Sequence, residues 1–78
     1  MNSTEITPVG GPADDLAAAV ALRKLADRLE DAAVEAAMRL GWSWTQVAEA
    51  LGVTRQAVHR KHMQRLADSG IDLRRRNG

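Results

Sequence analysis

The residues best equipped for chemistry lie in a basic stretch, residues 52–67, that contains no acidic side chain. Arg55 and Gln56 are adjacent, and two more donors follow one helical turn later. An arginine can donate two hydrogen bonds to guanine, and a glutamine amide can pair with an adenine edge. If this stretch is a helix in a DNA major groove, its N-terminal half presents base-reading side chains, namely Arg55, Gln56, His59 and Arg60.

Other polar residues in the same region suit DNA phosphates. Hydroxyl groups and backbone N–H groups at helix N-termini bind phosphate well, and outward lysine or arginine side chains add charge. The predicted phosphate-binding residues are Ser43, Thr45, Thr54, Lys61 and Arg65. The alternative interpretation is that all these polar side chains form only the solvated face of a stable helix.

Residues 42–69 carry the signals of two short helices joined by a tight turn. Ser43 and Gln46 have the spacing of a capping box, and Trp42 and Val47 that of a hydrophobic staple. Gly52 permits the sharp turn that follows. The apolar positions then predict an inner face that holds the two helices at a crossing angle, formed by Trp44, Val47, Ala48, Leu51, Val53, Val58 and Leu66.

These motifs resemble a known family. The sequence Gly52-Val-Thr-Arg-Gln-Ala-Val58 resembles the turn and recognition-helix start of bacterial sigma factor region 4. Residues 16–67 resemble small actinobacterial helix-turn-helix DNA-binding proteins, in which a leucine- and alanine-rich helix precedes the motif. Lys61 departs from the pattern, because many such proteins have a bulky apolar residue there. Its aliphatic stem is expected to pack while its ammonium reaches solvent.

A long helix is predicted over residues 13–41, with Asp14 as its N-cap and Gly41 as its stop signal. A bend near Glu30 and Asp31 is left open. Its apolar residues repeat in steps of four and three, the spacing of a coiled-coil seam. We expect this helix to form a dimer interface as well as to cover its own domain, although it could pack on its own domain alone. The interface residues would be Leu22, Leu25, Leu29, Ala32 and Ala36.

The ends of the chain and its charge pattern differ from this central part. Residues 1–12 contain prolines and glycines in a pattern typical of a flexible tail, and residues 70–78 form a basic arm with Arg74, Arg75 and Arg76. The net charge is −3 over residues 1–40 and +4 over residues 41–78. This asymmetry favours a polyanionic partner for the second half.

Composition narrows the classes of protein further. The chain has 78 residues and no cysteine, so it is one small domain that lacks disulfides and thiolate metal sites. Abundant alanine favours an all-α fold. The sequence has no apolar run long enough to span a membrane, and we expect no signal peptide. It contains no Gly-rich phosphate loop and no nucleophile paired with a base. His59 and His62 are three residues apart, but no nearby ligand completes a metal site.

The sequence therefore predicts an all-α protein with a long N-terminal helix followed by a helix-turn-helix. Its expected function is sequence-specific binding of double-stranded DNA in the major groove, as a homodimeric transcriptional regulator. It is expected to be neither an enzyme nor cofactor-dependent, and to act in the bacterial cytoplasm, at the nucleoid when bound. The alternative is an adapter that binds RNA polymerase or another protein through the long helix.

Overall fold

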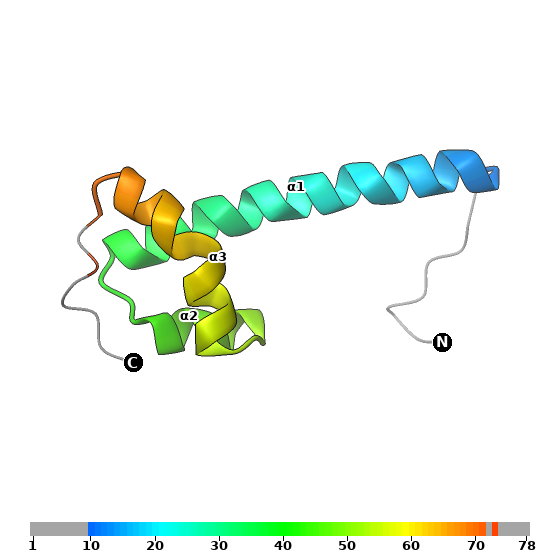
Figure 1. The fold of residues 1–78 in the computed structure, drawn as a ribbon. Helices are drawn as coiled ribbons and strands as arrows, with labels where there is room; N and C mark the ends of the chain where they lie inside the picture. Colours follow the sequence, from blue (N-terminus) through cyan, green and yellow to red (C-terminus); the bar gives the residue numbers. More distant parts are fainter. Residues whose placement is uncertain (1–9, 72, 74–78) are drawn as a thin grey trace.

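Three helices make up the part of the chain that the computed structural model describes, residues 10–71 and 73. They are α1 (Pro12–Arg39), α2 (Trp44–Leu51) and α3 (Arg55–Asp68), and these residues contain no strand. Figure 1 shows α2 and α3 gathered at the C-terminal end of α1, while the N-terminal half of α1 projects away from them. The predicted all-α fold is confirmed. The expected flexible tail lies mostly, and the Arg74–Arg76 arm wholly, outside the described residues.

The long helix begins earlier than the sequence predicted. Gly11 occupies the N-cap position and Pro12 the first helical position, so the prediction of Asp14 as the cap was wrong. Proline fits there because its φ angle is already helical and its missing N–H group is not needed. Asp14 and Asp15 instead lie in the first turn, where they face the positive end of the helix dipole. The helix continues without interruption through Glu30 and Asp31.

Local signals end α1 and begin α2. Gly41 has a φ of 92°, and the next N–H group, that of Trp42, donates to the carbonyl of Ala37 at 3.0 Å. This closes the last turn of α1. Ser43 Oγ accepts from the Gln46 N–H group, and Gln46 Oε1 accepts from the Ser43 N–H group, at 3.1 and 2.9 Å. The predicted capping box is therefore confirmed.

The turn between α2 and α3 depends on Gly52, whose φ of 70° is in the left-handed region. This conformation brings Val53 N within 3.1 Å of the Ala48 carbonyl oxygen and reverses the chain direction. Thr54 then caps α3 by accepting from the Ala57 N–H group at 3.1 Å. Two helices joined by so short a turn form the helix-turn-helix that the sequence predicted.

All three helices contribute to one small core. Its buried apolar residues are Val34, Met38, Trp44, Val47, Ala48, Val58 and Leu66. Ala48 provides the small side chain that the motif needs between its helices. Leu51 and Val53 were expected in this inner face, but they are 38% and 47% exposed. The reason is their position at the end of α2 and in the turn, where Leu51 lines the rim of a surface groove instead.

The packing of α1 uses a face that the seven-residue repeat did not indicate. Only Val34 and Met38 of α1 are buried. The predicted dimer residues Leu22, Leu25 and Leu29 are 62%, 59% and 69% exposed, and Ala32 and Ala36 are also exposed. No described helix is both long and apolar enough to cross a membrane.

The position of Met38 yields a stability prediction. Its side chain is 0% exposed, so Met38→Ala should lower the free energy of unfolding by about 2–5 kcal/mol, through lost burial and the cavity left behind. Leu16→Ala is the control, because Leu16 is 68% exposed on the projecting half of α1. Urea unfolding measures both. Equal losses for the two variants would contradict the described core.

Candidate functional site

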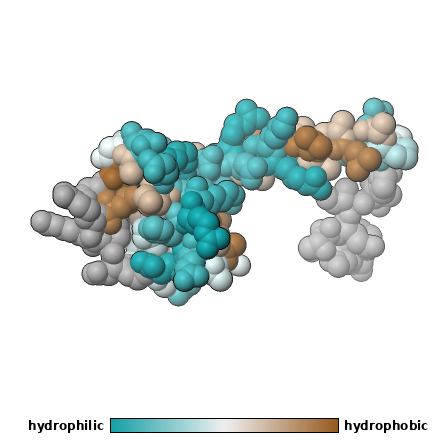
Figure 2. All heavy atoms as spheres, in the orientation of Figure 1, coloured by the Kyte–Doolittle hydropathy of each residue, from teal (hydrophilic) through white to brown (hydrophobic). Residues whose placement is uncertain are grey.

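The outer face of α3 carries the predicted base-reading residues together. Arg55, Gln56, His59 and Arg60 line one shallow surface hollow, which Met63 completes. Three of the four are exposed and His59 is half-buried. In the described part of the chain, no carboxylate pairs with Arg55 or Arg60. Figure 2 shows hydrophilic side chains over the face of the molecule where α3 lies. This face therefore offers two unpaired cations and an amide to a ligand.

His59 is held by the core beneath it. Its ring meets the Trp44 ring edge-on, with ring centroids 5.0 Å apart and an interplanar angle of 72°. Aromatic pairs prefer this arrangement. Trp44 is 2% exposed, so it is a core residue that also fixes the orientation of one side chain on the outer face.

The predicted phosphate-binding hydroxyls lie at the two helix N-termini. Ser43 and Thr54 each use an oxygen lone pair to cap a helix, and a hydroxyl that accepts a bond can still donate its hydrogen. Thr45 is half-buried in the first turn of α2. The capping geometry is thus compatible with phosphate binding, which stays a prediction for Ser43, Thr45 and Thr54.

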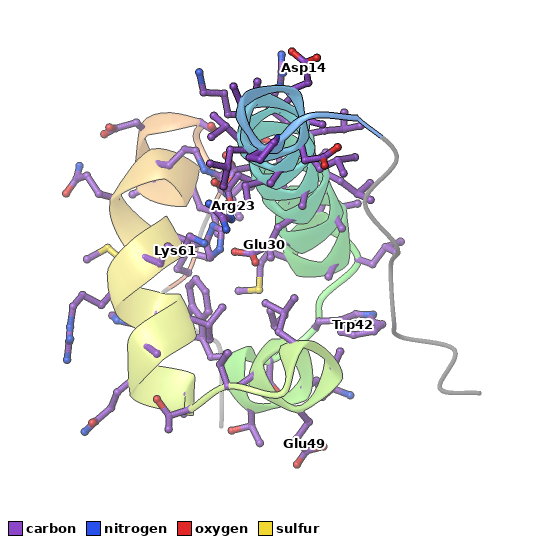
Figure 3. All side chains as sticks on the ribbon, turned by 90° about the vertical axis from the view of Figure 1, so that its right-hand side faces the viewer. Asp14, Arg23, Glu30, Trp42, Glu49 and Lys61 are labelled. Carbon is purple, nitrogen blue, oxygen red and sulfur yellow. The ribbon has the colours of Figure 1, made fainter. Side chains whose placement is uncertain are left out.

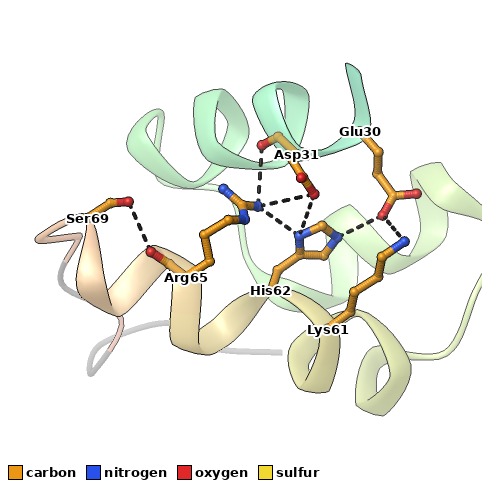
Figure 4. A network of polar contacts seen from close by, with 6 residues as sticks. All are labelled: Glu30, Asp31, Lys61, His62, Arg65 and Ser69. Carbon is orange, nitrogen blue, oxygen red and sulfur yellow. Dashed lines mark hydrogen bonds and ion pairs between the residues drawn. The ribbon is translucent and has the colours of Figure 1, made fainter. Parts of the chain in front are cut away.

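Lys61 and Arg65 take a different direction from the one the sequence suggested. The Lys61 ammonium lies 2.9 Å from Glu30 Oε2, so it pairs with α1 (Figure 4). Arg65 Nη2 donates to the main-chain oxygen of Asp31 at 3.4 Å and lies 3.7 Å from its carboxylate. Both head groups therefore bind α1 within the domain, and a further contact of Lys61 and Arg65 with DNA phosphates stays a prediction.

His62 is the buried centre of this network. Its side chain is 1% exposed, and its Nε2 lies 2.8 Å from Glu30 Oε2 while its Nδ1 lies 2.8 Å from Arg65 Nη2. A guanidinium can only donate, so Nδ1 must accept and Nε2 must carry the hydrogen that is donated to Glu30. Both ring nitrogens are thus satisfied, and this arrangement fixes the tautomer.

The network positions the outer face of α3. Glu30 and Asp31 on α1 hold three residues of α3, Lys61, His62 and Arg65, across the helix contact (Figure 4). Because these bonds fix the rotation of α3 about its axis, Arg60, which lies roughly on the opposite side of the helix from His62, is directed away from α1. No local pattern in the sequence indicates this network, since the partners are more than 30 residues apart.

The residues of this network also bear on the expectation that no nearby ligand could complete a metal site with the histidines. His59 and His62 do not converge, but Glu30, Asp31 and His62 place ligand atoms within 4.8 Å of one another. The sequence did not reveal these nearby carboxylates. Lys61 and Arg65 already supply the positive charge that these carboxylates require, and His62 Nε2 carries a hydrogen. We therefore assign the cluster to helix packing.

Charge pairing also shifts the ionisation of Glu30 and Lys61. The hydrogen bond from Lys61 lowers the pKa of Glu30 below its usual value, and the bond from His62 adds to this effect. The bond to Glu30 raises the pKa of the Lys61 ammonium in turn. Both shifts mean that the folded state favours the charged pair.

Comparison with known proteins places this geometry in a family. The family described as Homeodomain-like domain matches residues 18–74, which is most of the chain. The protein belongs to the homeodomain-like domain family. No curated protein and no solved structure matches the chain. Homeodomain-like domains carry a helix-turn-helix, so membership agrees with the arrangement of α2 and α3 and supports DNA binding through it.

The ion pair between α1 and α3 predicts a pH dependence of stability. Because the pKa of Glu30 is lowered on folding, its contribution is present above the ordinary carboxyl pKa and is lost as pH falls through the folded value. Glu30→Gln should cost about 1–2 kcal/mol of unfolding free energy at pH 7. The difference from the unaltered protein should shrink below about pH 4.

The control for this experiment is Glu49→Gln, since Glu49 is exposed on α2 and points away from α1 (Figure 3). Urea unfolding at pH values between about 3 and 7 gives the comparison. A constant cost of Glu30→Gln over this whole range would rule out the charged pair as its source.

Proposed function

We propose that this protein binds double-stranded DNA sequence-specifically by placing α3 in the major groove, and that it acts as a homodimeric transcriptional regulator. The observation that carries this proposal is the outer face of α3. Its guanidinium and amide groups are unpaired with described carboxylates, while the other cations of the same helix are bound to α1. If the outer face of α3 were only solvated, there would be no reason for its cations to stay unpaired while the other cations of the helix bind α1.

The proposed readers are the side chains nearest the N-terminus of α3. Arg55 and Gln56 are exposed in its first turn, where a recognition helix approaches base edges most closely. Arginine favours guanine and glutamine favours adenine. Arg60 and His59, one turn later, would contact bases or flanking phosphates. Ser43, Thr45 and Thr54 would position the domain on the backbone.

A dimer is proposed because one such module buries little surface on DNA. Single helix-turn-helix units bury about 600–1,000 Å², whereas two units can occupy half-sites about 34 Å apart. The contact surface would be the exposed leucine stripe of α1, which runs from Leu22 through Leu25 and Leu29 to Ala32 and Ala36. The likeness of residues 52–58 to sigma factor region 4, and of residues 16–67 to small actinobacterial proteins, supports a bacterial regulator. Inverted half-sites follow if the two copies are related by a two-fold axis.

One observation favours a second candidate function, that of an adapter on RNA polymerase or another protein. A groove of about 350 Å³ between α1 and α2 is lined by apolar residues. They are Ala33, Val34, Ala36, Ala37, Leu40, Trp42, Val47, Ala50 and Leu51. Such a surface suits a partner helix. The experiment on Arg55 and Gln56 separates this candidate from DNA reading.

The base-reading proposal predicts the effect of Arg55→Ala combined with Gln56→Ala. Selection from a random DNA pool should yield a defined sequence for the unaltered protein, and the double variant should lose at least about tenfold of its preference for that sequence. Circular dichroism should stay unchanged, because both side chains are exposed. Matched controls are Lys24→Ala on α1 and Gln64→Ala on α3. If the unaltered protein selects no defined sequence from the DNA pool, the DNA-reading proposal is wrong.

The role of charge is tested separately through salt. The logarithm of the binding constant should fall linearly with the logarithm of the salt concentration, by about 0.9 per neutralised phosphate. If Arg60 contacts a phosphate, Arg60→Gln should reduce this slope by about 0.9 per subunit and leave the selected sequence unchanged. Fluorescence anisotropy over a salt series gives the slope. A changed sequence with an unaltered slope would instead assign Arg60 to a base.

A further inference from the structure

The long helix has two apolar faces, and only one of them is covered. Val34 and Met38 pack on α2 and α3, whereas the leucine stripe lies about half a turn around the helix from them. Asp14 lies about five turns before Ala32 on the same side, and Figure 3 shows it pointing away from α2 and α3. The stripe is therefore exposed and, for most of its length, directed away from the rest of the domain; it is formed by Leu22, Leu25, Leu29, Ala32 and Ala36. Ala36, at its C-terminal end, also lines the apolar groove beside α2.

Side-chain size changes along this stripe. Its N-terminal part is leucine and its C-terminal part is alanine, with the change between Leu29 and Ala32. A parallel copy of the helix would set leucine against leucine and alanine against alanine, leaving poorly filled layers at one end. An antiparallel copy sets Leu25 and Leu29 each against an alanine, which fills space more evenly.

We propose that the stripe binds a second copy of this chain antiparallel to the first, with Leu25 against Ala36 of the partner subunit and Leu29 against Ala32 of the partner subunit. This inference deepens the proposed function, because it rests on the homodimer invoked there. Leu22 then lies against Arg39 of the partner subunit and beside Leu40 of the partner subunit, at the rim of the apolar groove. In a single copy, Leu40 is 80% exposed.

Charge on the edge of the stripe favours the same arrangement. Arg28 and Glu35 are seven residues apart, so they occupy equivalent positions on one edge. The antiparallel register brings Arg28 opposite Glu35 of the partner subunit, and symmetry forms this ion pair twice. In a parallel pair, these two residues would face alanine and leucine side chains instead, namely Ala33 and Leu40.

The other edge of the stripe permits close approach. It carries Ala19, Ala26 and Ala33, all small side chains that let two helix backbones come near each other. Glu35 currently accepts from Arg39 at 3.3 Å within its own chain, in a pair that is exposed. A carboxylate has room for a second donor. The pairing also leaves α3 uncovered, because it uses the side of α1 opposite Val34 and Met38.

Cysteine cross-linking tests the orientation directly, because the chain has no cysteine of its own. Leu25→Cys and Ala36→Cys are made as separate full-length proteins and oxidised alone and as a mixture. The antiparallel register predicts a disulfide-linked dimer only in the mixture. Self-linking of Leu25→Cys would show a parallel pair and overturn the proposal, and so would the absence of any linked dimer at about 100 μM.

Charge exchange tests the register independently. Arg28→Glu and Glu35→Arg should each weaken self-association about tenfold, since two attractive contacts become repulsive. The double variant should recover to within about threefold. Lys24→Glu is the control, because Lys24 is exposed on α1 away from the stripe and should have little effect. Analytical ultracentrifugation measures association, and circular dichroism confirms folding. Equal losses in the single and double variants would overturn the register.

DNA selection on the same proteins separates this inference from the proposed function. A linked dimer that selects no DNA sequence would support the pairing and contradict the DNA-reading function. A protein that selects a sequence but stays monomeric, both free and on DNA, would overturn the pairing while DNA reading stands. If the chain does not self-associate but binds a different protein through the stripe, that result would likewise overturn the pairing and assign the stripe to that partner.

Discussion

The orientation of α3 depends on the buried contact of His62 with Glu30 and Arg65. The core that joins the three helices is small, although it already turns Val58 and Leu66 of α3 inward. Hydrogen bonds are directional, and a buried imidazole that loses a partner is costly. By satisfying both nitrogens of His62 at 2.8 Å, the network selects one rotation of α3. That rotation determines which side chains are offered to a ligand.

The network also explains how one basic helix serves two purposes. Lys61 and Arg65 neutralise acids on α1, while Arg55 and Arg60 have no carboxylate partner among the described residues. The acidic character of the first half of the chain is therefore partly structural, since Glu30 and Asp31 hold α3 in place. A simple count of positive charges on α3 would overstate the charge that is available to DNA.

Most of the fold could be predicted from local signals. The capping box at Ser43 and Gln46, the turn at Gly52 and the helix end at Gly41 each act within a few residues, so the sequence reveals them directly. The outer face of α3 was equally accessible, because helical periodicity places Arg55, Gln56, His59 and Arg60 together. The start of α1 was misjudged because Asp14 is a good cap, yet Pro12 can begin a helix earlier.

What the sequence did not show depends on contacts between distant segments. Nothing in the spacing of Val34 and Met38 marks them as the core-facing residues of α1, when a longer leucine stripe competes for that role. The ionic partners of His62 and Lys61 are likewise set by the way α1 crosses α3. Lys61 is an unusual residue at its position in the motif, and the carboxylate of Glu30 explains its presence there.

The short turn at Gly52 has a consequence for the order of folding. It joins α2 and α3 through contacts between residues close in sequence, which form rapidly because little loop entropy is lost. The bonds from Glu30 and Asp31 to α3 span 32 and 34 residues and must close a much longer loop. We therefore expect the α2–α3 hairpin to act as the nucleus, with α1 docking last, so that substitutions in the ionic network mainly speed unfolding.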